Sequence, residues 1–269
     1  MSSTIRNMIE LDIFSKFISK VYNKIKKNVK FLYIRIFYRG HNINMQDLHF
    51  LSVINLRKVS KLIPLLRDSK SQLRQDLFVI SELNFKRNGY FVEFGACDGV
   101  KFSNSWILEN IFSWTGILAE PAEVWHNSIR LNRPKSIIDT RCVWNNSKSK
   151  VVFNEVDSPE LSSIDLFSNL DSHGPSRKNG RLYEVRTVSL QDLLDQYNAP
   201  KYIDYLSIDT EGSEFEILKA FNFKKYKFRI ITVEHNNTTQ RPLIYKLLTD
   251  NGYKRKFTDV IRGEDWYIA

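Results

Sequence analysis

The stretch that decides the fold reads YFVEFGACDG and spans residues Tyr90–Gly99. Its first five residues are apolar or aromatic except for Glu93, and the run ends at Gly95, as expected for a buried strand followed by a tight turn. We expect Gly99 to let the backbone approach a ligand. Because ligands of open parallel sheets bind outside the carboxyl ends of the strands, this loop is the first candidate for a binding site.

Segments with the pattern of strands alternate with segments with the pattern of helices along the rest of the chain. Strands are expected at 115–120, 136–140, 151–156, 183–188, 202–209, 228–234, 253–258 and 264–268. Helices are expected at 103–112, 121–131, 189–197, 213–220 and 239–250. Ser189-x-x-Asp and Ser213-x-x-Glu predict helix caps. The alternation predicts an α/β fold whose mostly parallel sheet has helices on both faces, with an antiparallel hairpin at one edge.

Two segments precede this region. Residues 1–40 have apolar side chains at helical spacing with lysines between them, and residues 41–88 have the pattern of a helical lead-in. We therefore expect a basic amphipathic helix at 1–40, the lead-in at 41–88 and the main domain at 89–269.

The positive charge of the chain is concentrated in this N-terminal tail. The first forty residues carry nine Lys and Arg against two acids, a net +7 of the total +10. The main domain is therefore nearly neutral, and we expect no nucleic-acid partner. The two cysteines form no disulfide framework, which favours reduced thiols and a cytoplasmic protein.

The tail matches neither a signal peptide nor a membrane span, because its longest apolar run, 31–34, is interrupted by Arg35. Basic amphipathic helices lie on anionic membrane surfaces, which predicts a peripheral position on the inner membrane face. The alternative is that the helix packs on the domain or on a second subunit.

Three kinds of cofactor suit a glycine-containing loop after a strand. A dinucleotide requires Gly-x-Gly-x-x-Gly, but Cys97 stands at the second glycine with the negative Asp98 beside it. A P-loop requires Gly-Lys-Ser/Thr, which the loop lacks. S-adenosylmethionine has no phosphate and carries ammonium and sulfonium cations, so acids at Glu93 and Asp98 would be favourable. The sequence therefore predicts S-adenosylmethionine.

The ends of the next two expected strands support this prediction. Glu120 ends the second strand, where a carboxylate accepts hydrogen bonds from a ribose diol. The third strand is followed by Arg141-Cys142-Val143, and we expect Cys142 to help frame the adenine.

Residues 71–269 resemble the FkbM family of methyltransferases. The likeness rests on the segments Ser71-Gln72, Gln75-Asp76, FVEFGACDG at 91–99, Ser103-Asn104, Leu108-Glu109, WTGILAEP at 114–121, DYLSIDTEGSE at 204–214 and VEHN at 233–236. The resemblance implies the class I methyltransferase fold, a Rossmann-like three-layer sandwich with a seven-stranded sheet. It also implies that Ala96 and Asn104 contact the cofactor together with Glu93, Gly95, Asp98 and Gly99.

The resemblance further implies methyl transfer to oxygen, with an acceptor that is often a sugar hydroxyl of a surface polysaccharide or glycolipid, or a natural-product hydroxyl. Such transfer needs a group that removes the proton of the hydroxyl. We expect Asp209 to orient the substrate or act as the base, His235 to be the other candidate base, and Glu211 to be functional. A loop-positioning role for His235 and a capping role for Glu211 are the alternatives.

Two further features of the acceptor side are expected. Asp209, Glu234 and Asn236 offer three oxygen ligands from adjacent strand ends, so a Mg²⁺ site is the alternative mechanism. Positively charged groups suited to an acidic or phosphorylated acceptor are Arg133, Arg141 and Arg177. The long loop 157–181, which contains Ser162 and Ser163, is the candidate acceptor lid.

Overall fold

The structure is a computed structural model that describes residues 27–38, 40, 43–258 and 263–269. The chain separates into two compact units, Met1–Arg67 and Asp68–Ala269. The first 26 residues of the predicted basic helix lie outside the described residues. The second unit begins well before the expected boundary at residue 89, since the lead-in helix nearest the sheet belongs to it.

The first unit is helical, as predicted. Its described part contains a helix at 27–37, α2 (Met45–Val53), α3 (Leu56–Leu62) and a short 3-10 turn, Ile63–Leu65. Asn44 caps α2, because its side chain accepts a hydrogen bond from the Asp47 backbone N–H at 2.8 Å. No helix among the described residues is long and apolar enough to cross a membrane.

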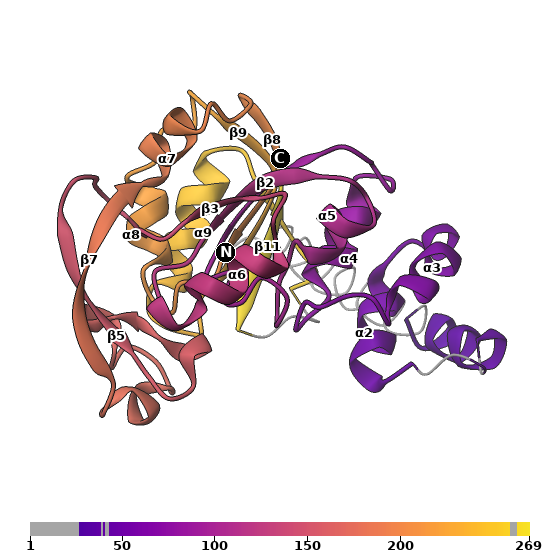
Figure 1. The fold of residues 1–269 in the computed structure, drawn as a ribbon. Helices are drawn as coiled ribbons and strands as arrows, with labels where there is room; N and C mark the ends of the chain where they lie inside the picture. Colours follow the sequence, from indigo (N-terminus) through magenta and orange to yellow (C-terminus); the bar gives the residue numbers. More distant parts are fainter. Residues whose placement is uncertain (1–26, 39, 41–42, 259–262) are drawn as a thin grey trace, which may run out of the picture. The chain divides into compact units, whose positions relative to one another are not determined.

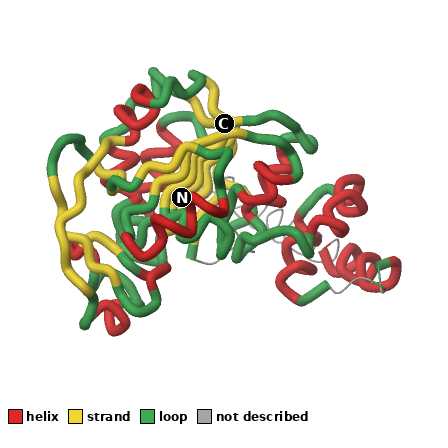
Figure 2. Tube along the Cα trace, in the orientation of Figure 1, coloured by secondary structure: helices red, strands yellow, loops and turns green. Residues whose placement is uncertain are grey.

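The second unit is built on a seven-stranded sheet in the order β10-β11-β9-β8-β1-β2-β3 (Figure 2). Its strands are β1 (Tyr90–Phe94), β2 (Thr115–Ala119), β3 (Ile137–Asp139), β8 (Tyr202–Ile208), β9 (Lys227–Glu234), β10 (Lys254–Lys256) and β11 (Glu264–Ile268). The five neighbouring strands β9, β8, β1, β2 and β3 are parallel, whereas β11 is antiparallel to β9 and to β10. The predicted parallel sheet and its antiparallel edge hairpin are both confirmed.

Helices cover both faces of this sheet, which confirms the predicted three layers. The helices α7 (Leu190–Gln196), α8 (Glu214–Lys219) and α9 (Arg241–Asp250) share one core with side chains of β1, β8 and β9. The helices α4 (Gln75–Glu82) and α5 (Trp106–Asn110) lie on the other side (Figure 1). Alternate residues of β1 divide between the faces: Val92 and Phe94 belong to the core beneath α7–α9, whereas Phe91 and Glu93 point away from it.

A second sheet stands beside the first in the order β4-β7-β5-β6. Its strands are β4 (Cys142–Trp144), β5 (Lys150–Glu155), β6 (Ser163–Ile164) and β7 (Arg181–Ser189), and Figure 1 shows β5 and β7 extending away from the main sheet. A small apolar cluster lies beneath it: Ala122, Cys142, Phe153, Ile164, Phe167 and Val185. Only β5 and β7 were expected from the sequence, because β4 and β6 are too short to give a pattern of their own.

Most predicted helices are present, but their starts differ from the prediction. The segment expected at 121–131 begins as a 3-10 turn, Glu123–Trp125, and continues as α6 (His126–Asn132). Ser189 caps α7 as predicted, since its Oγ accepts from the Asp192 N–H at 3.0 Å. Ser213 makes no such bond to α8. The neighbouring Glu214 instead accepts hydrogen bonds from the amides of the loop that precedes the helix.

Candidate active site

A cavity of about 340 Å³ lies at the carboxyl ends of the central strands. Each of four strands contributes to its wall through a residue at or just after its end: Gly95 after β1, Glu120 after β2, Asp209 after β8 and Glu234 at the end of β9. The expected site residues Gly95, Glu120 and Asp209 therefore lie together, since parallel strands present their carboxyl ends at one edge of the sheet.

Gly95 allows β1 and β8 to meet closely at this edge. Its φ of +71° lies in the left-handed region, and a Cβ atom at this position would be 1.8 Å from the backbone oxygen of Asp209. No other residue fits there without moving one strand end away from the other. The absence of a side chain at Gly95 thus allows the ends of β1 and β8 to approach each other at the cavity wall.

Glu120 is held by backbone amides on both sides. One carboxylate oxygen accepts from the Cys97 N–H at 2.8 Å and the other from the Ala122 N–H at 2.8 Å. Burial nevertheless raises the pKa of Glu120 to about 7. Each oxygen keeps a free lone pair, so the side chain can still accept hydrogen bonds from two neighbouring hydroxyls in the cavity.

Asn104 presents a buried oxygen without a partner among the described residues. Its Nδ2 donates to Ser207 Oγ at 2.9 Å, whereas its Oδ1 accepts no hydrogen bond. Glu93 lies behind it and fixes the loop by accepting from the Asn104 N–H at 2.6 Å and from the hydroxyls of Ser103 and Ser105. An amide oxygen left bare at a cavity wall is suited to a donor supplied by a ligand.

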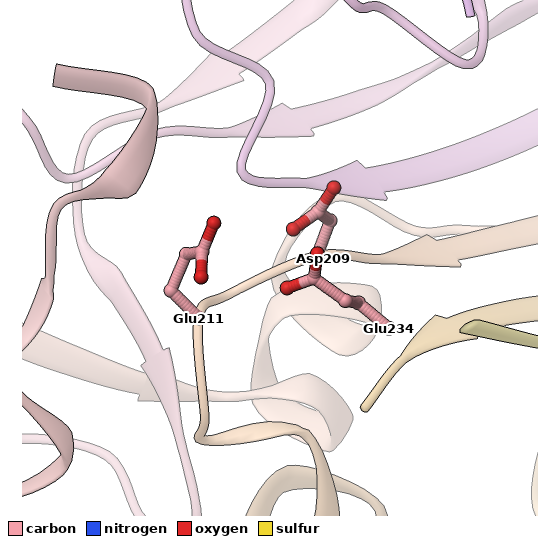
Figure 3. A group of neighbouring side chains, drawn as sticks. All are labelled: Asp209, Glu211 and Glu234. Atoms are coloured by element: carbon pink, nitrogen blue, oxygen red, sulfur yellow. The ribbon is translucent and has the colours of Figure 1, made fainter. Parts of the chain in front are cut away.

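Three carboxylates of the cavity wall lie close together. Asp209, Glu211 and Glu234 each place an oxygen within 4.8 Å of the other two (Figure 3). Burial raises the pKa of all three, to about 6 for Asp209, and their mutual repulsion raises the pKa of Glu211 and Glu234 further. Arg177 Nη2 donates to Glu211 at 2.7 Å, which opposes this rise without cancelling it.

Comparison with known proteins assigns this site to a family. The sequence model of the methyltransferase FkbM domain matches residues 93–255, which is more than half of the chain. The chain belongs to the FkbM methyltransferase family. Its fold is therefore the class I methyltransferase fold, and its cofactor is S-adenosylmethionine.

Solved methyltransferase structures resemble this one only distantly. A methyltransferase FkbM from Methylobacillus flagellatus is 12% identical, with a TM-score of 0.43 over 79% of this chain and 60% of that one. The precorrin-6y C5,15-methyltransferase of Geobacter metallireducens is 13% identical, with a TM-score of 0.39 over 72% of this chain and 85% of that one. No protein with a curated description matches the sequence.

The residues of the FkbM domain fit the cofactor at one side of the cavity, which we call the cofactor half: Gly95, Asn104, Glu120, Cys142 and Val143. Glu120 could accept hydrogen bonds from the ribose diol, and the unpartnered Oδ1 of Asn104 could accept one from the ammonium group. Cys142 and Val143 also line the wall, and contact of Cys142 with the adenine stays a prediction. The three carboxylates Asp209, Glu211 and Glu234 form the acidic half.

Several residues of the first loop support the site rather than line it. Asp98 Oδ1 accepts from the N–H groups of Val100 and Lys101, and neither Asp98 nor Glu93 reaches the cavity wall. The prediction that both acids face the cofactor cations was therefore wrong. Ala96 is also buried outside the wall.

The expected role of Gly99 was wrong as well. A Cβ at Gly99 would lie 2.6 Å from Cγ of Arg133, so this glycine makes room for a side chain of the protein and not for a ligand. Of the residues expected from the loop, Gly95 and Asn104 line the cavity.

His235 does not lie in the cavity wall, which corrects its prediction as a base. Its Nδ1 accepts from the Asn237 N–H at 2.9 Å, and its Nε2 lies 3.7 Å from Asp265 Oδ1 in a buried position. Successive side chains of a strand end point to opposite sides, so Glu234 enters the cavity and His235 turns away from it. The alternative, that His235 positions the loop, agrees with these contacts.

The three arginines expected to contact an acidic acceptor are all engaged within the protein. Arg133 is fully buried and pairs with Glu109 at 2.8 Å, and Arg141 pairs with Asp139. Arg177 is fully buried between Asp171 and Glu211. These ion pairs leave no arginine of this set directed at an acceptor, so the prediction was wrong.

The expected oxygen cluster gains a neighbour that the sequence analysis did not include. Glu211 places an oxygen within 4.8 Å of oxygens of Asp209 and Glu234, and Asn236, which also lines the cavity, donates to Glu211 through its Nδ2 at 3.1 Å. Loop 157–181 supplies residues 159–162 and His173 to the wall, whereas its lid role stays a prediction.

Sequence reasoning missed one part of the wall altogether. Gln75 at the start of α4 and Glu264 at the start of β11 line the cavity together, and Gln75 Nε2 donates to Glu264 Oε2 at 3.0 Å. Burial raises the pKa of Glu264 to about 8. Gln75 stands in a segment on which the family resemblance rests, which was the available signal, but nothing local pointed to Glu264.

Proposed function

We propose that this methyltransferase acts on an oxygen atom, namely a hydroxyl of a sugar in a surface polysaccharide, glycolipid or related glycan. The observation that carries the proposal is Asp209, which lines the cavity in its acidic half and whose backbone lies next to Gly95 of the cofactor half. With a pKa raised to about 6, Asp209 is ionised at neutral pH and still accepts a proton readily. Such a group is a suitable base for an alcohol.

The proposed step balances without a further reactant. S-adenosylmethionine supplies a methyl group bound to a positively charged sulfur. The acceptor oxygen forms the new O–C bond as the S–C bond breaks with its electron pair to sulfur, and the hydroxyl proton passes to Asp209. The remaining carboxylates of the acidic half are placed to accept hydrogen bonds from neighbouring hydroxyls of the acceptor.

The wall near the acidic half supports a sugar as the acceptor. Glu160, Ser162 and His173 line the same cavity as the carboxylates. Hydroxyl groups both donate and accept hydrogen bonds, so a wall of carboxylate, hydroxyl and imidazole groups suits a polyol. A flat aromatic phenol would leave these polar groups without partners, at a cost in free energy.

The test is transfer of a labelled methyl group from S-adenosylmethionine to fractionated cell glycans. We expect labelling with the wild type and a fall of about 10²–10⁴ in rate with Asp209→Asn, because the variant cannot take the proton. Calorimetry must show that Asp209→Asn still binds the cofactor, which separates loss of the base from loss of the site. Equal rates would remove Asp209 from the mechanism.

The same labelling and calorimetry experiments distinguish two rival proposals from this one. If the acceptor is a natural-product hydroxyl, label enters small-molecule extracts and leaves the glycan fractions unlabelled. If the protein is a non-catalytic adaptor at the membrane, calorimetry detects no cofactor binding, and Glu120→Ala behaves as the wild type.

The membrane expectation also gains a specific surface. The helix at 27–37 buries Ile34 and exposes apolar side chains at positions i, i+3, i+4, i+7 and i+8: Val29, Leu32, Tyr33, Ile36 and Phe37. Lys30 and Arg35 flank this stripe. An apolar stripe between basic side chains fits an anionic lipid surface, and we propose that it contacts one.

Flotation with vesicles tests this contact on the full-length protein. We expect binding to phosphatidylcholine vesicles that contain phosphatidylserine, little binding without it, and loss of binding in Ile36→Glu/Phe37→Glu. Leu131→Glu/Leu166→Glu is the matched control, because it places the same two negative charges at two other exposed apolar residues. Equal flotation of both variants would overturn the proposal.

A further inference from the structure

The acidic half of the cavity contains three carboxyl groups but only one paired cationic side chain among the described residues. Asp209 follows β8, Glu211 lies two residues further, and Glu234 ends β9, so the three carboxylates are fixed by separate backbone positions. Figure 3 shows them gathered at one place. Glu211 is paired with Arg177. Among the residues that the structure describes, neither Asp209 nor Glu234 has an ion-pair partner.

A second, independent observation is the state of the Glu234 carboxylate. Its Oε2 atom is buried and has no hydrogen-bond partner in the described part of the chain. A buried carboxylate oxygen without a donor costs more free energy than almost any other polar group. The residue also lines the cavity, so the missing partner can be supplied from within the cavity.

The surrounding contacts hold the carboxylates in place rather than neutralise them. Arg177 bridges Asp171 at 2.8 Å and Glu211 at 2.7 Å, and Asn236 Nδ2 donates to the same Glu211 oxygen at 3.1 Å. Both bonds go to Oε2 of Glu211, so its Oε1 has no donor among the described residues. The side chain is therefore oriented in advance, as is usual for a ligand fixed by a second layer of contacts.

Two occupants other than an ion would relieve the charge. One is a proton shared between Asp209 and Glu234. The other is the ammonium group of the cofactor, but the bare Oδ1 of Asn104 in the cofactor half already offers that group an acceptor. A proton would neutralise one of the three carboxylates, whereas a divalent cation balances two charges and fills several oxygen coordination positions.

The spacing suits such an ion. Oxygen atoms that share one Mg²⁺ at about 2.1 Å lie roughly 3–4 Å apart, and Ca²⁺ accepts somewhat wider spacing. The three oxygens here lie within 4.8 Å of one another, so small rotations bring them to a common ion. Oxygen donors are the ligands that Mg²⁺, Mn²⁺ and Ca²⁺ prefer.

We propose that Asp209, Glu211 and Glu234 bind one divalent cation of the Mg²⁺, Mn²⁺ or Ca²⁺ class. The role of the ion rests on the proposed function: beside the cofactor half it would bind the acceptor hydroxyl and stabilise the oxygen as its proton leaves. The binding itself does not rest on that function, because the three ligands belong to this chain.

The experiment measures Mn²⁺ binding to the full-length protein without cofactor, by the loss of the free Mn²⁺ signal in electron paramagnetic resonance. We expect one site per chain, competition by Mg²⁺ or Ca²⁺, and at least tenfold weaker binding in Glu234→Gln. Glu160→Gln is the matched control, since Glu160 lines the same cavity outside the cluster and should bind Mn²⁺ as the wild type does.

A second measurement guards against a variant that fails to fold. The wild-type melting temperature should rise with Mg²⁺ concentration, and the rise should be absent in Glu234→Gln if that variant melts cooperatively. Absence of Mn²⁺ binding by the wild type, or equal affinity in Glu234→Gln, would overturn the proposal. Cofactor binding measured in excess EDTA tests the methyltransferase site separately, so failure of one proposal is distinguishable from failure of the other.

Discussion

The two halves of the cavity differ in how many hydrogen-bond donors the protein supplies to their carboxylates. In the cofactor half, Glu120 stands alone and each of its oxygens accepts a backbone N–H at 2.8 Å. In the acidic half, only Glu211 pairs with an arginine in the described part of the chain, and Glu234 Oε2 has no donor there. In the cofactor half, backbone N–H groups already satisfy one acceptor position on each Glu120 oxygen. In the acidic half, Glu234 Oε2 has no such donor, so a bound proton or cation would have to supply its partner.

Substitution of Gly95, where the ends of β1 and β8 meet, should have the largest effect on cofactor binding. Gly95→Ala places a Cβ at the position that lies 1.8 Å from the Asp209 oxygen, so it must push the ends of β1 and β8 apart. Because both halves depend on this approach, we expect more than about 100-fold weaker cofactor binding in calorimetry.

Gly252→Ala is the control for Gly95→Ala. Gly252 also has a positive φ, +91°, but a Cβ there meets nothing within 4 Å. It should cost about 1 kcal/mol of unfolding free energy and leave cofactor binding unchanged. Wild-type affinity in Gly95→Ala would show that cofactor binding does not depend on the close approach of the two strand ends.

Arg177, the buried arginine of the acidic half, should make a large contribution to the free energy of unfolding. Arg177→Met leaves Asp171 and Glu211 without their buried cation, and we expect a loss of about 3–5 kcal/mol in urea unfolding. The loss should shrink as the pH falls, because protonation of the two acids removes the uncompensated charge. Arg181→Met, at an exposed arginine that pairs with Glu123 and Glu155, should change little. Equal losses in the two variants would contradict the special position of Arg177.

The sequence predicted the strand-end residues because their position follows from topology alone. Gly95, Glu120 and Asp209 come directly after buried strands, and parallel strands bring such positions to one edge. What the pattern could not supply is the direction of a side chain beyond the strand. His235 and Asp98 stand in the expected loops, yet their side chains bond to the loops themselves.

Long-range pairing was equally out of reach of the pattern. Gln75 and Glu264 are 189 residues apart and meet at the cavity wall only after α4 and β11 are both in place. The role of Gly99 was unpredictable for the same reason. Its lack of a side chain makes room for Arg133, which directly follows α6, and not for a ligand. Neither contact leaves a local signature in the chain.

Glu120→Ala tests the completed half directly. It removes the acceptor of the ribose diol and leaves the Cys97 and Ala122 amides without partners, so we expect about 10–100-fold weaker cofactor binding in calorimetry. Mn²⁺ binding at the acidic half should persist. Glu123→Ala, an exposed acid three residues further, should bind the cofactor as the wild type does. Loss of both ligands in Glu120→Ala would mean that the halves are not independent.

The smallest effect comes from protonation of the same carboxylate. Burial raises the pKa of Glu120 to about 7 in the free protein, and the ribose diol binds best to the ionised form. The free protein therefore holds more protons than the bound form below pH 7, so acid opposes binding. Between pH 8 and pH 6 we expect the affinity for S-adenosylmethionine to fall about tenfold, with proton release on binding near pH 6.

Calorimetry in buffers of different ionisation enthalpy measures that proton release. Asp209 and Glu264, with pKa values raised to about 6 and about 8, also titrate in this range. Glu120→Gln keeps both of them, so the difference between the two pH profiles isolates Glu120. A profile that stays as steep in Glu120→Gln would assign the released proton to Asp209 or Glu264, the other cavity carboxylates that titrate in this range.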